Sequence, residues 1–493
     1  MPSPNSALTQ QLSSMTQAIP KRDLSHYETY RGLPALAGLA SMQRAVTAEW
    51  SLDDSVERLK RLHYVLKRLY ETLTAQITSE PIYELKTAFS YHGYLCAEQV
   101  TLIRKRVSEM REPPLGLDKI PHAALERLMD EVRAADTTES LLLGVYEVVI
   151  PATLQALKKL KEDAHPLADA PTVRIARLME FELSDVLQFG VTAVQQLVTS
   201  EQRVAATQWL ELLNACLKAA GEVDGTQPVR DVVPEPMLSN KPYRYAKEPR
   251  RDERFQDSFN AGVNPEAFLY DKKFRPRDKT LMMYYKRIRE IDVPEMMASI
   301  LVELGPQEPW EFHQEMMRQL WDEARHAMMG EVGFAAQGLD WRQIPINFTW
   351  SRNLNLQLDA RERHGVLFFI EQGLMPRTGK RYEYEVGLES GDPLSGLFQD
   401  FDWADEVLHA QIGRRWYVPR FSSLNEALSY GDKCWSRVLS HWQAYREQGL
   451  TEHRNWWPEL YKQACENWQI APDPAALAYS KTYEDSRADL QKL

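Results

Sequence analysis

Apolar side chains recur at every third or fourth position over long stretches of this chain, which is the spacing of one face of an α-helix. Leu59, Leu62, Leu66 and Leu69 form one such stripe. Prolines break the pattern between the stretches, because proline cannot continue a helix. In the first half of the chain, the pattern predicts helices over residues 53–79, 82–110, 122–135, 138–163, 171–199 and 200–220.

A second helical set begins near residue 279. The pattern predicts helices near residues 279–304, 308–334, 361–375 and 393–417. The first connection is a tight turn at Gly305-Pro306, the second is long (335–360), and the third has moderate length (376–392). A long middle connection is typical of the ferritin-like four-helix bundle, in which this link crosses over the bundle.

We therefore expect an all-α fold with more than one domain, since 493 residues exceed what one hydrophobic core usually organises. We expect the N-terminal domain to be a metal-free bundle for packing, dimerisation or substrate capture. It lacks the D-E-x-x-H motif, described below, that can supply metal ligands from a helix. The expected parts are a lead-in (1–50), an N-terminal helical domain (51–220), a connector (221–278), a ferritin-like di-metal domain (279–420) and a C-terminal helical extension with a polar tail (421–493).

The connector is rich in proline and has little periodicity, so we expect it to run along a surface. It carries a cluster of arginines at Arg250, Arg251 and Arg254. The cluster could bind an anionic substrate, although a solvated group of charges is the commoner arrangement.

Charge and cysteine content narrow the function classes. The net charge is −11, from 70 acidic and 59 basic residues, and an acidic surface repels phosphate backbones, which argues against nucleic acid as a partner. Four cysteines lie far apart without a CxxC pair, as expected in the reducing cytoplasm. Residues 1–20 lack the apolar stretch of a signal peptide, and the sequence has no run of about 18 apolar residues. We expect a soluble cytoplasmic protein without a membrane span.

One motif exceeds the background. The pattern D-E-x-x-H occurs at residues 322–326 and again at 405–409, each time inside a predicted helix. Residues three apart lie on one helix face, so Glu323 and His326 can reach the same point, and so can Glu406 and His409. A carboxylate and an imidazole from each of two helices are half of a two-metal site, and the other two helices must each add a carboxylate.

The third helix offers Glu371, which follows an apolar run and would need a compensating cation if it is buried. The first helix offers Glu290 and Glu295. The interval from Glu290 to Glu323 resembles that from Glu371 to Glu406, which favours Glu290. Glu295 instead shares an apolar stripe with Ile288, Ile291, Ala298 and Val302, and Pro294 could kink the helix between the two glutamates. The choice stays open at this point.

Four further polar residues share these helix faces. Asp322 and Asp405 precede the motif glutamates and could either support the ligands or face solvent. Asp402 and His364 lie on the faces of Glu406 and Glu371, where each could be an extra ligand but is more simply a hydrogen-bonded neighbour.

Residues 280–420 resemble a bacterial ferritin-like family of largely unassigned function. The resemblance is carried by D-E-A-R-H at 322–326, F-I-E-Q-G-L at 369–374, Gly391-Asp392, D-E-V-L-H at 405–409 and G-R-R-W at 413–416. A more distant resemblance is to di-iron hydroxylases and oxidases, such as the tRNA hydroxylase and aldehyde-deformylating oxygenases. It implies two metal ions held by Glu290, Glu323, His326, Glu371, Glu406 and His409.

The expected function is that of an O2-dependent di-iron oxidase or oxygenase acting on a small organic substrate, with Glu323 and Glu406 as its catalytic carboxylates. Carboxylate and imidazole ligands suit iron, manganese or a mixed pair, and not copper(I). No flavin or iron–sulfur motif is visible, so we expect an external reductase as a partner, and a homodimer on general grounds. The alternatives are a metal-storage protein and a scaffold that keeps a vestigial site.

Overall fold

The computed structural model describes residues 22–110, 116–439, 442–483 and 485. Within these ranges the chain forms helices joined by turns and loops, and no β-strand occurs. The all-α prediction is therefore confirmed. Residues 1–21, 111–115, 440–441, 484 and 486–493 lie outside the described residues.

The helices of the first half agree with the predicted ones within a few residues. Short turns come first, at η1 (Tyr30–Gly32), η2 (Ala35–Gly38) and α2 (Met42–Ala45). They are followed by α3 (Leu52–Ser79), α4 (Tyr83–Ser108), α5 (Ala123–Arg133), α6 (Thr138–Leu142), the π-helical segment η3 (Leu143–Val149), α7 (Ile150–Asp163), α8 (Ala170–Leu197), α9 (Ser200–Ala205) and α10 (Thr207–Ala219). Local capping explains one of these starts, because the Ser51 side chain accepts a hydrogen bond from the Asp54 backbone N–H at the beginning of α3.

The stretch from Thr138 to Asp163 is long and apolar enough, by length and composition, to cross a membrane. In this structure 67% of its most apolar window is buried inside the protein. Packing against other helices therefore accounts for its hydrophobicity.

Residues 220–275 are mostly irregular, with only η4 (Leu238–Asn240) and α11 (Pro265–Leu269). The later part of this segment differs from the surface linker that its composition predicts. Its aromatic side chains Phe255, Phe268 and Phe274 are buried in a core together with helices of the second half. Arg251 is also buried, so the arginine cluster is not simply solvated.

Four helical stretches of the second half pack around one another as a bundle. They are α12 (Pro276–Ile288) continued through η5 (Arg289–Ile291) into α13 (Asp292–Leu304), then α14 (Trp310–Ala336), α16 (Ala360–Gly373) and α18 (Pro393–Trp416). α14 contacts both α13 and α18, and α16 contacts the same two helices from the other side. The four stretches therefore enclose a common interior. The turn between α13 and α14 is η6 (Gly305–Gln307).

The first of these stretches is interrupted at η5, between the two candidate glutamates. Pro294 lies four residues after Glu290 and has no backbone N–H, so the Glu290 carbonyl loses its usual helical partner. The break lets Glu290 and Glu295 point to different surroundings.

Two connections contain helices that the sequence pattern does not predict. The long one holds η7 (Trp341–Gln343) and α15 (Thr349–Gln357), and the moderate one holds α17 (Lys380–Glu389), which packs on α12 and α18. The connection over 376–392 thus contains a helix and is not a plain loop. After the bundle come η8 (Val418–Arg420), α19 (Leu424–Leu439), α20 (Trp442–Glu447), α21 (Trp457–Asn467) and α22 (Pro474–Leu477).

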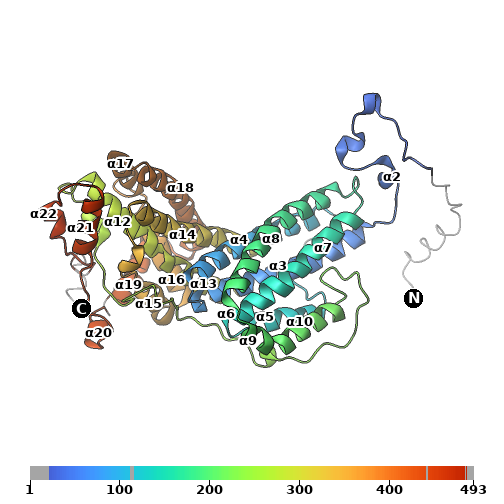
Figure 1. Cartoon of the computed structure of the whole chain (residues 1–493), viewed down its shortest axis with the longest axis horizontal. Coiled ribbons are helices and arrows are strands. Elements are labelled where there is room, and N and C mark those ends of the chain that lie inside the picture. The colour runs from blue at the N-terminus through green and yellow to red at the C-terminus, as the bar shows by residue number, and fades with distance from the viewer. Residues whose placement is uncertain (1–21, 111–115, 440–441, 484, 486–493) are drawn as a thin grey trace.

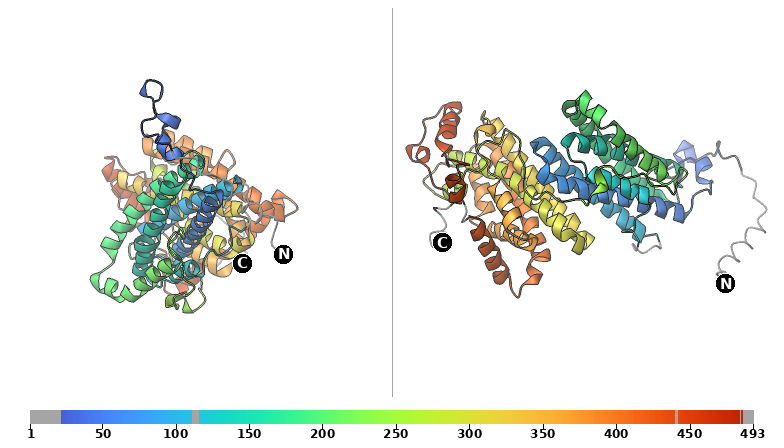
Figure 2. Two further views of the ribbon diagram at one scale, coloured as in Figure 1. Left: turned by 90° about the vertical axis from the view of Figure 1, so that its right-hand side faces the viewer. Right: turned by 90° about the horizontal axis from the view of Figure 1, so that it is seen from below.

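The molecule is elongated, with the helices of the first half at one end and those of the second half at the other (Figure 1). A second view, from below, shows the same two-ended shape (Figure 2). Between them, α3 packs on α13 and α4 packs on α14. One hydrophobic cluster is continuous across this contact, since it includes Leu73 of α3, Phe89 of α4 and Phe312 of α14. The two halves therefore share a core.

Candidate metal centre

The two D-E-x-x-H motifs face each other inside the bundle. His326 of α14 and His409 of α18 are almost completely buried, and their ring centres lie 5.9 Å apart. The α14 motif faces inward because it belongs to a stripe of buried side chains that includes Met316, Leu320 and Ala327. Burial of the histidines thus follows directly from the helical period of the apolar residues.

Two groups of potential metal ligands surround these rings. In the first group, ligand atoms of Glu323, Glu371, Glu406 and His409 all lie within 4.8 Å of one another. The His409 Nδ1 atom is 3.1 Å from Glu323 Oε1, 3.7 Å from Glu406 Oε2 and 3.9 Å from Glu371 Oε1.

The second group consists of Glu290, His326 and Asp402. The His326 Nδ1 atom is 3.4 Å from Glu290 Oε2 and 3.6 Å from Asp402 Oδ1. Glu323 also reaches this group, since its Oε2 atom is 3.7 Å from the same nitrogen. The Glu323 carboxylate therefore lies between the two histidines, with one oxygen atom towards each.

The aspartates that precede the motif glutamates support the histidines crosswise. Asp405 of α18 lies 3.2 Å from His326 Nε2, and Asp322 of α14 lies 3.4 Å from His409 Nε2. Arg325 donates to both aspartates. Each aspartate thus orients the ring of the opposite helix and leaves its Nδ1 atom directed at the carboxylates, which is the usual arrangement behind metal-binding histidines.

Two cations of the protein itself contact the carboxylates. Arg287 of α12 pairs with Glu290 at 2.8 Å and also with Asp402. Lys380 of α17 lies 2.8 Å from Asp402 and 2.9 Å from Glu406. When all five carboxylates of the two groups are ionised, they exceed these two cations by three negative charges.

The electrostatics of the cluster favour an added cation. Burial alone would lower the pKa of His326, but the neighbouring Asp405, Glu290 and Glu323 carboxylates raise it to about 10. Burial also opposes ionisation of Glu406, yet Lys380 and the hydrogen bond with Glu371 hold its pKa well below the usual value. Burial raises the pKa of Glu371 well above normal, and the neighbouring Glu406 and Glu323 raise it further. Protons and metal ions would compete for this excess of negative charge.

Several buried atoms of the cluster that could bind a metal ion have no hydrogen-bond partner among the described residues. They are Glu290 Oε2, Glu323 Oε1, His326 Nδ1, Glu406 Oε2 and His409 Nδ1. Buried polar atoms in folded proteins almost always have a partner. Five such atoms that converge on one interior region, all of them oxygen or imidazole nitrogen, fit hard first-row metal ions.

Glu290 and Glu295 have separate surroundings. Glu290 belongs to the second ligand group, whereas the Glu295 carboxylate accepts hydrogen bonds from Lys86 at 2.7 Å, Arg251 at 3.0 Å and Ser351 at 2.6 Å. Glu295 is fully occupied by these partners and is absent from both groups. The geometry therefore favours Glu290 over Glu295 as the ligand of the first helix.

Asp402 joins a ligand group, although the sequence pattern favoured the role of a hydrogen-bonded neighbour. His364 does not join one. Its ring is buried against Phe312 and Tyr417, and burial lowers its pKa to about 3. Sequence reasoning missed Arg287 and Lys380. The spacing of three residues between Arg287 and Glu290 could have indicated an ion pair on one helix face, but no pattern in the sequence placed Lys380 near the cluster.

Histidines of the first half have other partners. His92 Nδ1 is hydrogen-bonded to the Tyr146 hydroxyl at 2.8 Å. Glu162 and His165 have E-x-x-H spacing, but Glu162 is exposed and His165 Nδ1 accepts from the backbone N–H groups of Leu167 and Ala168. His92 thus contributes to core packing, and His165 stabilises the turn that follows it.

A cavity of about 120 Å³ adjoins the cluster. Glu290, Glu323, Glu371 and Glu406 are among its lining residues. Most of the remaining wall is apolar and comes from α13, α15, α16 and α19, through Val293, Met296, Trp350, Leu354, Leu367, Ile370, Leu374 and Trp435. A small molecule in this cavity would lie directly against the carboxylates.

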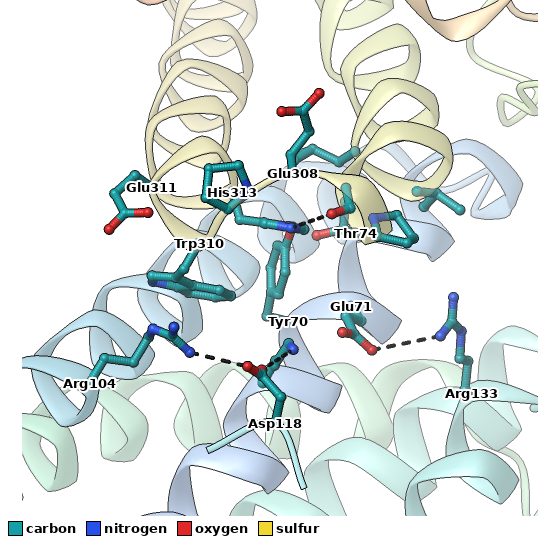
Figure 3. Close-up of a pocket in the computed structure, with 16 residues that line it drawn as sticks. Tyr70, Glu71, Thr74, Arg104, Asp118, Arg133, Glu308, Trp310, Glu311 and His313 are labelled. Atoms are coloured by element: carbon teal, nitrogen blue, oxygen red, sulfur yellow. Dashed lines mark hydrogen bonds and ion pairs between the residues drawn. The ribbon is translucent and has the colours of Figure 1, made fainter. Parts of the chain in front are cut away.

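A larger cavity of about 590 Å³ lies at the junction of the two halves, between α3, α4 and the α13–α14 turn (Figure 3). Four of its charged side chains already pair with one another: Lys67 with Asp118 at 2.7 Å, and Arg133 with Glu71 at 3.7 Å. Tyr70 and His313, at its inner wall, are hydrogen-bonded to each other. We therefore place the chemistry at the smaller cavity.

Comparison with known proteins finds no matching family model, no matching curated protein and no matching solved structure.

Proposed function

We propose that this chain is a cytoplasmic, ferritin-like, non-haem di-iron oxidase or oxygenase that uses O2 to oxidise a small organic substrate. The observation that carries the proposal is the convergence of five buried carboxylate and imidazole atoms from the helices of one bundle, which face one another without a hydrogen bond among the described residues. Two E-x-x-H helices facing two glutamate-bearing helices are the ligand pattern of ferritin-like di-iron proteins. Manganese or a mixed pair would suit the same ligands.

Seven residues would hold two ions. His409, Glu371 and Glu406 would hold the first, His326, Glu290 and Asp402 would hold the second, and Glu323, which reaches both histidines, would serve both. Bound iron would supply the reduction of O2 and the oxidising power for a C–H or N–H bond.

The remaining groups of the site would position and shield the reaction. Asp322 and Asp405 would fix the tautomer and orientation of the histidines. Arg287 and Lys380 would hold Asp402 and Glu406 in place and offset part of their charge. The apolar wall of the adjoining cavity would exclude water from the substrate.

Glu323 and Glu406 remain the proposed catalytic carboxylates. Both line the cavity and both belong to the first ligand group, so they would face the substrate and the metal at once. An electron donor must come from elsewhere, so we include an external reductase in the proposal.

The test is the metal content of the chain expressed with added iron, combined with optical spectra before and after anaerobic reduction and exposure to oxygen. About two irons per chain and an oxygen-dependent spectral change are expected. His409→Ala and His326→Ala should each remove about one iron, because each deletes a nitrogen ligand of a different group.

Other outcomes favour other functions. More than two metal ions per chain would indicate storage. A chain without metal, or with zinc that iron cannot displace, would indicate a scaffold with a vestigial site. Full metal content in both histidine variants would show that the ligand assignment is wrong.

A further inference from the structure

Arg289 is a buried cation beside the cluster cavity. It lies in η5, directly before Glu290, and its side chain is only 6% exposed and lines the cavity. Its guanidinium is held between aromatic rings, 4.5 Å from the centre of Trp350 and 5.1 Å from that of Tyr483.

Among the described residues, Arg289 has no carboxylate within ion-pair distance. Its Nη1 atom donates to the Tyr483 hydroxyl at 2.6 Å, and its Nε atom has no hydrogen-bond partner. The other buried arginines of this region differ, since Arg287 pairs with Glu290 and Asp402, and Arg251 pairs with Glu295. Burial opposes the Arg289 charge, but Tyr483, Tyr285, Glu266 and Asp292 raise its pKa without a direct ion pair. A ligand anion in the cavity would therefore be its first direct ion-pair partner among the described residues.

Other charged residues that line the cavity restrict this anion. Lys286 is paired with Glu383, and Glu266 accepts a hydrogen bond from Tyr483. Asp292 also lines the cavity and interacts electrostatically with Arg289, although no ion pair joins the two side chains among the described contacts. A dianion would bring a second negative charge towards Asp292 and Glu290, so a monoanion fits this wall better.

Size limits the rest of the ligand. An apolar cavity of about 150 Å³ holds one benzene molecule, and this cavity has about 120 Å³. The ligand body should therefore have roughly six non-hydrogen atoms by that comparison. The aliphatic and tryptophan side chains of the wall call for a hydrocarbon body.

We propose that the cavity binds a short-chain monocarboxylic acid, with its carboxylate on Arg289 and its hydrocarbon body directed along the apolar wall towards Glu323 and Glu371. The inference deepens the proposed function, because it names the substrate class of the same site. Arg289 is in this scheme the substrate-anchoring residue, and Tyr483 keeps its guanidinium in place.

Pentanoate is the probe, and its affinity is measured by calorimetric titration of the full chain in two forms: iron-loaded under nitrogen, and metal-free after chelation. Pentanamide has the same shape without the charge, pentanedioate adds a second charge, and decanoate exceeds the cavity. Pentanoate should bind both forms of the protein about tenfold to a hundredfold more tightly than pentanamide, as expected for a hydrogen bond to a charged group. Pentanedioate and decanoate should bind more weakly than pentanoate.

Arg289→Met keeps the apolar stem of the side chain and removes its charge, and should lose this preference for pentanoate over pentanamide. Arg289→Lys should retain part of it. Arg277→Met is the matched control, since Arg277 is an exposed arginine on α12 that also covers an aromatic ring, at 4.8 Å from Trp468. It should leave the affinity for pentanoate unchanged. If Arg289→Met does not fold, the affinities of the unmodified chain for pentanoate and pentanamide still show whether the cavity prefers a carboxylate.

Equal affinities for pentanoate and pentanamide would overturn the inference. So would pentanoate binding that requires iron and survives Arg289→Met, because the carboxylate would then sit on the metal. The experiment distinguishes this inference from the proposed function. If the chain binds pentanoate through Arg289 but holds no redox-active iron, only the proposed oxidase function is refuted. If its iron reacts with oxygen but pentanoate does not bind, only the role of Arg289 is refuted.

Discussion

At the residue scale, the crossed contacts between the two motif helices are the most specific feature of the site. Asp322 and His326 lie on α14, and their partners lie on α18: His326 is hydrogen-bonded to Asp405, and Asp322 to His409. Since each histidine has its Nε2 atom on an aspartate, its Nδ1 atom is left for the carboxylate cluster. The D-E-x-x-H motif thus carries two tasks, ligation by its glutamate and histidine, and support of the opposite histidine by its aspartate.

Replacement of either aspartate should therefore weaken metal binding without removal of a ligand. Asp322→Asn should lower the affinity at the His409 group, and Asp405→Asn that at the His326 group, each by about tenfold to a hundredfold. Competition with a chromophoric chelator measures both affinities. Asp400→Asn, an exposed position on α18, is the control and should have no effect; equal affinities in all three variants would show that the crossed contacts are unimportant.

At the scale of elements, small residues set how closely α14 approaches α12. A Cβ atom at Gly330 would lie 2.2 Å from the backbone nitrogen of Ile288, and one at Gly333 would lie 2.2 Å from the Tyr284 ring. The first contact is with backbone, which cannot move aside as a side-chain tip can. Because Ile288 is two residues before Glu290, the same close approach places the first-helix glutamate beside His326.

Gly330→Ala should be destabilising even though alanine favours helix by about 1 kcal/mol over glycine. The steric conflict should reduce the free energy of unfolding by about 1–3 kcal/mol net, as overpacking usually does, and should reduce iron content. Urea denaturation with metal analysis measures both. Gly373→Ala near the end of α16 is the matched control, since its Cβ would meet nothing within 4 Å; a loss of stability there equal to that of Gly330→Ala would remove the steric explanation.

At the scale of the whole molecule, Glu295 connects three distant parts of the chain. It lies on α13 of the bundle, and its partners Lys86 and Arg251 come from α4 and from the connector. All three side chains are at most 1% exposed. Burial alone would raise the pKa of Glu295, but Arg251 and Lys86 lower it to about 2. The carboxylate thus joins the two halves electrostatically, beside their shared hydrophobic core.

Glu295→Gln should leave two buried cations without a counter-ion and reduce the free energy of unfolding by about 3–5 kcal/mol, while iron content stays normal. Glu290→Gln should do the reverse, with lost iron and a smaller loss of stability in the metal-free protein. Glu311→Gln, an exposed glutamate on α14, should change stability by no more than about 0.5 kcal/mol. Loss of iron in Glu295→Gln would reopen the choice between the two glutamates.

The Glu295 contribution should also depend on pH with a definite sign. Because its folded-state pKa of about 2 lies below the usual value of 4.5, its stabilisation is present above pH 4.5 and disappears as the pH falls towards 2. The difference in unfolding free energy between the unmodified chain and Glu295→Gln should therefore shrink over that range. A difference that stays constant from pH 6 to pH 3 would mean that the ion pairs contribute nothing.

The sequence by itself determined the long helices and the two inward-facing motifs, because both depend on a local period of three to four residues that an apolar stripe reveals. It also indicated Glu371, whose apolar neighbours require burial. Only the tertiary structure distinguished Glu290 from Glu295, since that choice depends on Lys86 and Arg251, which approach from other parts of the chain. The same holds for Asp402, for Lys380 on an unexpected helix, and for the cavity beside Arg289. Charge pairing in a buried interior is decided by which remote side chains arrive there, and no local pattern carries that information.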